Sequence, residues 1–246
     1  MILCYVTDRH LLRQSADNSA LRDELLRHIE RTAAAGVDWI QIREKDLHAR
    51  ELVELTRGAV AAAKHAGLNV TKAKEKSGAQ GGVTTRAAAR VIVNDRVDVA
   101  LAGGAAGVHL GATSAPATEV IRWLRAGNAP ADFMAGVSCH ELSEAIAAEN
   151  AGANYIFFGP IFETPSKKAF GPPQGTMRLA EICSRVHIPV LGIGGITQGN
   201  ASSCLRAGAA GIAAIRMFQE TQASSDLAET VSRLRGSAAS ASATNP

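Results

Sequence analysis

The chain repeats one unit eight times: a short apolar run, a loop of polar residues or glycine, and a segment with helical spacing of its apolar residues. The apolar runs lie at residues 2–7, 39–42, 91–93, 107–109, 134–137, 155–158, 190–193 and 211–215. The helical segments lie at residues 21–34, 49–65, 97–102, 117–126, 142–150, 177–186, 200–207 and 226–234. Strands that alternate with helices indicate βαβ units and parallel pairing. Eight such units predict an α/β protein with a (β/α)8 barrel fold.

A doubly wound open sheet is the competing architecture. Such a sheet usually carries G-x-G-x-x-G after its first strand, and Thr7-Asp8-Arg9 stands there instead. Three of the helical segments end in an Ala-Gly turn, whose glycine is expected to cap the helix before the next strand. A length of 246 residues suits a barrel that forms a single domain, and we assign residues 1–235 to it.

Two segments interrupt the repeat. Residues 67–88 are much longer than an ordinary connection from a helix to a strand and are rich in Gly, Lys and Thr, so we expect a flexible insertion. Because the segment precedes a strand, it belongs to the face opposite the loops that follow the strands, away from a barrel's active site. Residues 236–246 have low complexity, which predicts a disordered tail.

Composition argues against several classes of protein. The 26 basic and 23 acidic residues nearly cancel, and no basic stripe is present, so nucleic acid is not an expected partner. No run approaches the length of a membrane span, and the apolar first residues lack the basic segment of a signal peptide. The four cysteines are widely separated, which indicates neither a zinc site nor a disulfide framework and favours the cytoplasm.

Candidate functional residues follow the apolar runs, because barrel active sites lie at the carboxyl ends of the strands. Strand alternation places Gln41, Arg43 and Lys45 on one side and Glu44 on the other. Two cations and an amide that face one space indicate a bound anion. The alternative is that the strand ends earlier and these side chains are solvated.

The segment from Tyr155 to Gly175 predicts a second anion-binding element. A buried strand leads into a loop with Gly, Pro, two hydroxyl groups and two lysines, and its backbone can approach a ligand closely. The polar residues of this loop are Thr164, Ser166, Lys167 and Lys168. A solvated surface loop explains the same composition about equally well.

Other strand ends carry further candidates. Asp95, after Asn94, could hold Mg²⁺ on a phosphorylated substrate or cap the helix that begins at Arg96. At the end of the fifth run, a hydrogen bond from Ser138 to a ligand is a better interpretation than nucleophilic attack by Cys139, since no orienting group for the thiol is evident. Loops after the last two strands often bind phosphate in such barrels, and here they carry Gly194-Gly195 and Ile215-Arg216.

Together, the segments QIREKD, VNDRVDVAL, GVHLG, GVSCHE, FFGPIFETPSKK, PQG and GIGGIT resemble the thiamine phosphate synthase and TenI family over nearly the whole chain outside the insertion and the tail. The resemblance implies a (β/α)8 barrel. It also implies a transferase that joins hydroxymethylpyrimidine pyrophosphate to thiazole phosphate and releases pyrophosphate, with Mg²⁺ as cofactor. The expected partners are small phosphorylated molecules and a second copy of the chain in a homodimer.

The resemblance also implies roles for individual residues. Those assigned to the pyrimidine and its diphosphate are Gln41, Arg43, Lys45, Asn94, Ser138 and Lys167, of which Arg43, Lys45, Ser138 and Lys167 act in catalysis. Those assigned to thiazole phosphate are Thr164, Ser166, Gly195, Ile215 and Arg216. Asp95 is the expected Mg²⁺ ligand. Ser114 stands where the family's synthases usually have a second carboxylate ligand, which weakens the expected metal site.

Two other functions remain as alternatives. A TenI-type tautomerase would act on thiazole phosphate alone, but its catalytic His follows the glycine after the sixth strand, where this chain has Pro160 after Gly159. A non-catalytic binder of thiamine phosphate or its precursors is favoured by Ser114. Retention of the residues assigned to the diphosphate favours the synthase over both.

Overall fold

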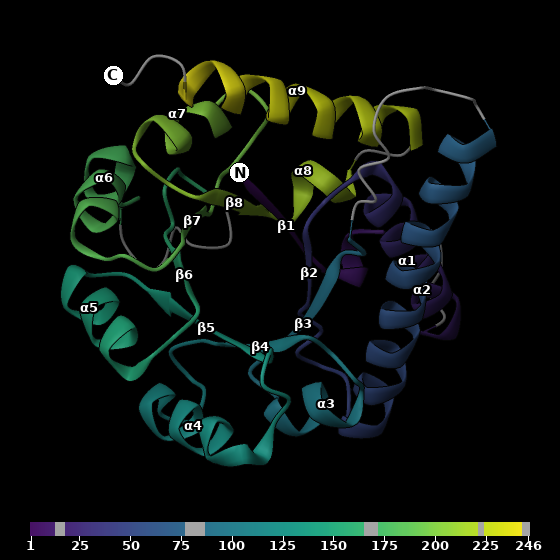
Figure 1. The fold of residues 1–246 in the computed structure, drawn as a ribbon, viewed down its shortest axis with the longest axis horizontal. Coiled ribbons are helices and arrows are strands. Elements are labelled where there is room, and N and C mark those ends of the chain that lie inside the picture. Colours follow the sequence, from purple (N-terminus) through teal and green to yellow (C-terminus); the bar gives the residue numbers. More distant parts are fainter. Residues whose placement is uncertain (13–17, 77–86, 165–171, 221–223, 243–246) are drawn as a thin grey trace.

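The computed structural model describes residues 1–12, 18–76, 87–164, 172–220 and 224–242. Eight parallel strands form a closed barrel in sequence order, with β8 paired to β1, and helices surround it (Figure 1). The strands are β1 (Ile2–Val6), β2 (Trp39–Ile42), β3 (Arg90–Asn94), β4 (Gly107–Leu110), β5 (Met134–Cys139), β6 (Tyr155–Phe158), β7 (Val190–Ile193) and β8 (Gly211–Ala214). The predicted fold is confirmed.

The helices lie mostly where the apolar spacing predicts them. They are α1 (Asn18–Ala35), α2 (Ala49–Lys76), α3 (Val97–Ala102), α4 (Ala117–Trp123), α5 (Leu142–Ala151), α6 (Gly175–Arg185), α7 (Ala201–Arg206), α8 (Arg216–Gln219) and α9 (Ser224–Ser242). A short 3₁₀ turn, η1 (Arg9–Leu11), follows β1, and a π-helical turn, η2 (Leu124–Asn128), extends α4. The glycines of the three Ala-Gly turns, Gly36, Gly152 and Gly208, all have the positive φ of a helix cap.

Two helices run further than predicted. Residues 67–76 of the expected insertion continue α2, because a glycine costs a helix only about 1 kcal/mol and the Lys, Ala and Glu residues that follow favour helix. The expected disordered tail is helical as far as Ser242, since its Ala-rich sequence contains no proline before the last residue. Residues 77–86 and 243–246 lie outside the described part of the chain, and the domain assignment stays a prediction.

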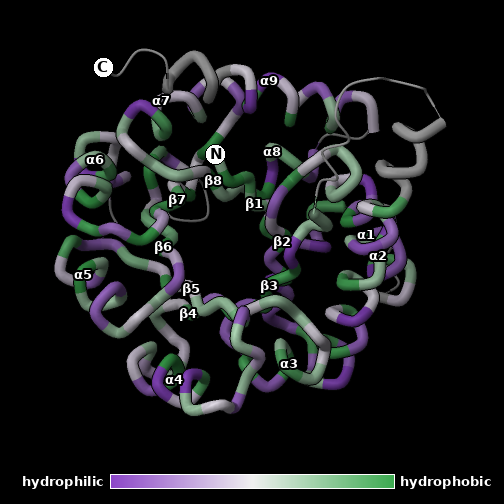
Figure 2. The backbone as a smooth tube through the Cα atoms, in the orientation of Figure 1, coloured by the Kyte–Doolittle hydropathy of each residue, from purple (hydrophilic) through white to green (hydrophobic). Residues whose placement is uncertain are grey.

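The apolar side chains form two layers on either side of the strands. Inside the barrel, Cys4, Val6, Ile92, Met134, Tyr155, Phe157, Leu191 and Ala213 pack together. A larger cluster lies between the strands and the surrounding helices and includes Leu3, Tyr5, Ile42 and Phe158. Figure 2 shows hydrophobic residues along the strands and many hydrophilic residues on the outer helices. Along each strand, successive residues therefore alternate between the barrel interior and the helix layer.

Aromatic rings close the barrel interior below the carboxyl ends of the strands. The Tyr155 ring lies 4.7 Å from Trp39 and 5.3 Å from Phe157, between ring centroids. Gly136 makes room for Tyr155: a Cβ atom at Gly136 would lie 2.0 Å from the Tyr155 ring. Among the described residues, no helix is long and apolar enough to cross a membrane.

Candidate active site

The carboxyl ends of β2 and β3 place three predicted site residues in one hydrogen-bonded chain. Gln41 is only 2% exposed, and its Nε2 donates to Asn94 Oδ1 at 2.9 Å. Asn94 Nδ2 in turn donates to Asp95 Oδ2 at 2.5 Å. Because the Asn94 amide is held at both ends, its orientation and that of the Asp95 carboxylate are set together.

Ser114 lies beside Asp95, although 19 residues separate them in the sequence. The Ser114 hydroxyl donates to Asp95 Oδ1, which also accepts from the Gly111 backbone N–H at 3.1 Å. Asp95 has a φ of 62°, a left-handed conformation that Asp tolerates better than most residues. The N-cap of α3 is Arg96, with no side-chain capping hydrogen bond. The structure therefore does not show the capping role that was the alternative for Asp95.

The groups that donate hydrogen bonds to the Asp95 carboxylate are the Ser114 hydroxyl, the Asn94 side-chain amide and the Gly111 backbone N–H. Mg²⁺ prefers oxygen ligands and is commonly held by one or two carboxylates together with substrate phosphates and water. One carboxylate and the Ser114 hydroxyl fit such a substrate-assisted site. In the described part of the chain, no group of three or more His, Cys, Asp or Glu residues gathers to hold a metal without substrate.

His109, on β4, contacts a predicted site residue and was not singled out in the sequence analysis. Its Nε2 lies 2.8 Å from Ser138 Oγ and its Nδ1 lies 3.2 Å from the Tyr155 hydroxyl. Burial lowers the pKa of His109 to about 3, so the imidazole is neutral and one of its nitrogens donates while the other accepts. The predicted ligand donor Ser138 is thus oriented from below by a buried imidazole. For His109 the available sequence signal was a histidine within a short apolar strand run.

Arg43 and Lys45 follow β2 in a short loop. Arg43 is half-buried and Lys45 is exposed. Glu44, between them, is buried on the outer side of the barrel against Thr7 and Arg9. β2 ends at Ile42, before Arg43 and Lys45, and the Lys45 side chain is solvated, as the alternative interpretation expected. Gln41 and Glu44 nevertheless reach partners in different places, Asn94 and Thr7.

The second half of the barrel contributes Gly195, Ile215 and Arg216 to the same rim. Gly195 has a φ of 66°, and a Cβ atom there would lie 2.6 Å from the Glu163 carbonyl oxygen, so only glycine fits. Ile215 precedes α8 and packs on the inner apolar cluster, whereas the Arg216 side chain extends to within 3.8 Å of Glu220. Thr164 is half-buried. Ser166, Lys167 and Lys168 lie outside the described residues.

Cys139 faces the helix layer and has no exposed surface. Burial raises the pKa of its thiol to about 12, so the thiol is protonated at neutral pH. The neighbouring His140 uses Nδ1 to donate to the Gly159 carbonyl oxygen at 2.5 Å. This geometry agrees with the sequence-based preference against a Cys139 nucleophile.

Comparisons with known proteins agree on one family. The profile described as "Thiamine monophosphate synthase" matches residues 71–218. A protein of Geobacter sulfurreducens that bears a provisional thiamine-phosphate synthase name is 41% identical over 213 residues, which are 87% of this chain and 84% of the relative. A thiamine-phosphate synthase of Roseiflexus sp. is 38% identical over 87% of this chain and 76% of the relative.

The chain belongs to the thiamine monophosphate synthase family. A solved thiamine phosphate pyrophosphorylase from Pyrococcus furiosus superposes with a TM-score of 0.73 and 27% identity, over 98% of this chain and 96% of that chain. The family resemblance inferred from the sequence motifs is confirmed.

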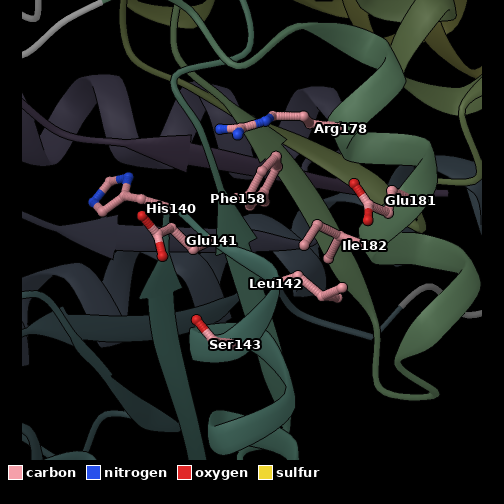
Figure 3. Close-up of a pocket in the computed structure, with 8 residues that line it drawn as sticks. All are labelled: His140, Glu141, Leu142, Ser143, Phe158, Arg178, Glu181 and Ile182. Atoms are coloured by element: carbon pink, nitrogen blue, oxygen red, sulfur yellow. The ribbon is translucent and has the colours of Figure 1, made fainter.

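A cavity of about 320 Å³ lies outside the predicted family site (Figure 3). It is lined by residues after β5 and by α6, including His140, Glu141, Arg178 and Glu181. Phe158, whose side chain belongs to the outer apolar layer, forms part of its wall. None of the residues predicted to bind substrate is among these lining residues.

Two buried histidines make the stability of the fold dependent on pH. Burial lowers the pKa of His28, on α1, to about 4, as it does that of His109 to about 3. In the unfolded chain both would titrate near 6.5, so their stabilising contribution is complete above that pH and is lost as the pH falls toward the folded values. Between pH 6 and 5 the free energy of unfolding should fall by up to about 1.4 kcal/mol per pH unit for each histidine. Urea titrations at pH 7, 6 and 5 measure this slope.

His28 offers the variant for this measurement because it lies outside the candidate site. Its Nε2 donates to the Phe218 carbonyl oxygen at 3.1 Å. His28→Gln should lower stability at every pH but should also make the slope shallower, since it removes one group that takes up a proton on unfolding. An unchanged slope would show that His28 is not held neutral in the fold.

Proposed function

We propose that this protein is a thiamine phosphate synthase, which condenses 4-amino-2-methyl-5-hydroxymethylpyrimidine pyrophosphate with thiazole phosphate and releases pyrophosphate. The observation that carries the proposal is the chain from Gln41 through Asn94 and Asp95 to Ser114, at the same end of the barrel as Arg43 and Lys45. Family relatives bear the synthase name. A protein that bound only thiazole phosphate would need one anion-binding site. It would not need the residues on β2 and β3 as a second site.

The reaction breaks the bond between the pyrimidine's methylene carbon and a diphosphate oxygen. Pyrophosphate leaves with the bonding electron pair, and the thiazole nitrogen then forms the new bond to that carbon. Negative charge grows on the leaving group, so fixed positive charge close to it lowers the barrier. We assign this role to Arg43, Lys45 and Lys167, and we assign orientation of the pyrimidine ring to Ser138.

The chain's other contribution is to hold the two substrates together. Gln41 and Asn94 are fixed by their mutual hydrogen bond and can orient the diphosphate without rearrangement. We assign the thiazole phosphate to Thr164, Ser166, Gly195, Ile215 and Arg216, where Gly195 lets the backbone approach the phosphate closely. No general base or covalent nucleophile is required, which agrees with the buried, protonated Cys139.

We propose Mg²⁺ as the cofactor, held by Asp95 and Ser114 with the diphosphate oxygens and water. When bound, the ion supplies charge that stabilises the departing pyrophosphate. Asp95 is already oriented for this by Asn94, Gly111 and Ser114. Because the chain offers one carboxylate there, metal and diphosphate should each tighten the binding of the other by the same factor.

Incubation of the protein with both substrates and Mg²⁺ tests the function, with thiamine phosphate and pyrophosphate as the products to measure. The same assay addresses the alternatives. A tautomerase would convert an isomer of thiazole phosphate without the pyrimidine substrate, and Pro160 after Gly159 counts against it. A non-catalytic binder would take up the phosphorylated compounds and form no product at any metal concentration.

Ser114→Asp should lower the Mg²⁺ concentration that gives half-maximal rate. The new carboxylate would lie beside Asp95 and complete the pair of charged ligands usual in the family's synthases. Rate measurements over a Mg²⁺ titration, with Ser114→Asn as the uncharged control of the same size, would show whether charge is responsible. An equal shift in both variants would contradict the proposed metal position.

We further propose that the enzyme works in the cytoplasm as a homodimer. The four cysteines are free and three of them are buried, which suits a reducing compartment. Size-exclusion chromatography with light scattering measures the oligomeric state.

A further inference from the structure

The loop that carries Arg43 and Lys45 is tied to the end of β1 by a buried polar network. Thr7, Arg9 and Glu44 are 0%, 3% and 4% exposed. The Thr7 hydroxyl accepts from the Arg43 backbone N–H at 3.0 Å and donates to Glu44 Oε1 at 2.6 Å. The other carboxylate oxygen of Glu44 accepts from Arg9 Nη1 at 3.1 Å. The position of the Arg43 backbone therefore depends on Thr7, and that of Thr7 on Glu44 and Arg9.

Arg9 also holds the far end of the same loop. Its guanidinium donates to both oxygens of Asp46, at 2.7 and 2.6 Å, in the bidentate arrangement of a strong ion pair. Its backbone N–H lies 3.2 Å from each Glu44 carboxylate oxygen. Lys45 is thus bracketed by two acidic residues that are both anchored to Arg9. The position of Lys45 depends on contacts that it does not make itself.

The charge arrangement has a consequence for anion binding. A carboxylate placed between two cations in sequence would normally pair with one of them and reduce its attraction for a substrate anion. Here Glu44 points to the outer side of the barrel and pairs with Arg9. Within the described residues, neither Arg43 nor Lys45 takes part in an ion pair. Both cations are therefore available to a ligand.

We infer that Glu44 is a positioning residue for the diphosphate site, which with Thr7 and Arg9 sets the loop so that Arg43 and Lys45 converge on a diphosphate. This inference rests on the proposed function for the identity of the substrate. The contacts themselves concern how the loop is held, and they apply to whichever anion Arg43 and Lys45 bind.

Substitutions at Thr7 test this network most specifically. Thr7→Val keeps the shape of the side chain but removes the hydroxyl that links Arg43 to Glu44, whereas Thr7→Ser keeps the hydroxyl. Glu44→Gln keeps an acceptor for Thr7 but places an amide donor or an uncharged oxygen against the Arg9 guanidinium. The control is Arg235→Met, which removes a more exposed ion pair, with Asp38, next to the start of β1.

The experiment measures KM for each substrate separately and the binding of inorganic pyrophosphate by calorimetry. Thr7→Val and Glu44→Gln should raise KM for the pyrimidine diphosphate and weaken pyrophosphate binding at least tenfold, while KM for thiazole phosphate stays within twofold. Thr7→Ser should restore wild-type values. Arg235→Met should lower the melting temperature and leave both KM values unchanged.

The inference is overturned if folded Thr7→Val protein keeps wild-type pyrophosphate affinity, or if both KM values rise together with the loss of thermal stability, which would indicate a merely structural role. If Glu44→Gln does not fold, the comparison of Thr7→Val with Thr7→Ser tests the positioning role instead. A wild-type protein that makes no thiamine phosphate would overturn the proposed function alone, because pyrophosphate binding still tests the positioning role.

Discussion

Asp95→Asn should lower kcat/KM for thiamine phosphate formation at least a hundredfold, which corresponds to about 2.7 kcal/mol of lost transition-state stabilisation. Asn tolerates the left-handed backbone found at this position, so the fold should be kept. The substitution removes the carboxylate proposed for Mg²⁺. It also disturbs the hydrogen bonds, because an amide nitrogen would face a donor from either Asn94 or Ser114. Steady-state rates at saturating Mg²⁺ measure the effect.

Asp98→Asn is the matched control. Asp98 lies three residues further along, on α3, and forms an exposed ion pair with Arg96 whose Nη2 to Oδ2 distance is 2.6 Å. Such surface pairs contribute about 1 kcal/mol or less to stability, and this one lies outside the proposed site. Its activity should stay within twofold of wild type. Wild-type kcat/KM in Asp95→Asn would remove Asp95 from the proposed site.

Gly136→Ala should destabilise the barrel by about 3 kcal/mol, the upper part of the range for overpacking a core. The added methyl group would lie 2.0 Å from the Tyr155 ring and 2.4 Å from its hydroxyl oxygen. Tyr155 cannot move aside easily, because Trp39, His109 and Phe157 surround it within the barrel. For a domain of this size the melting temperature should fall by roughly 10 °C. Urea unfolding monitored by circular dichroism measures the free energy directly.

A second substitution tests whether the Tyr155 ring causes the destabilisation by Gly136→Ala. Tyr155→Leu removes the ring and should be destabilising alone, but the combination Gly136→Ala with Tyr155→Leu should lose at least about 1 kcal/mol less than the sum of the two single changes. Gly236→Ala is the control, because a Cβ atom there would meet no neighbouring atom within 4 Å. Additive single and double effects would show that Tyr155 is not the group that excludes a side chain at position 136.

Periodicity explains why the barrel could be predicted. Parallel strands buried on both faces give continuous apolar runs, and the polar residues that follow them mark the rim. Strand alternation also predicted the opposite directions of Gln41 and Glu44: Gln41 bonds to Asn94, and Glu44 reaches Thr7 on the outer side. The ends of α2 and α9 were not predictable in the same way, because a single glycine is a weak stop signal.

The order of strands and helices, and the side of a strand that a residue occupies, follow from the amino-acid sequence because they depend on spacing between near neighbours. The family followed from the resemblance of its motifs and not from that spacing. Which polar groups meet depends instead on the three-dimensional fold. Asp95 and Ser114 are 19 residues apart, His109 and Ser138 are 29 apart, and Arg9 and Glu44 are 35 apart. Their pairing is set by the register between parallel strands and by the paths of the loops. The pKa of His109 is lowered because barrel closure removes its imidazole from water, and that burial has no local signature in the sequence.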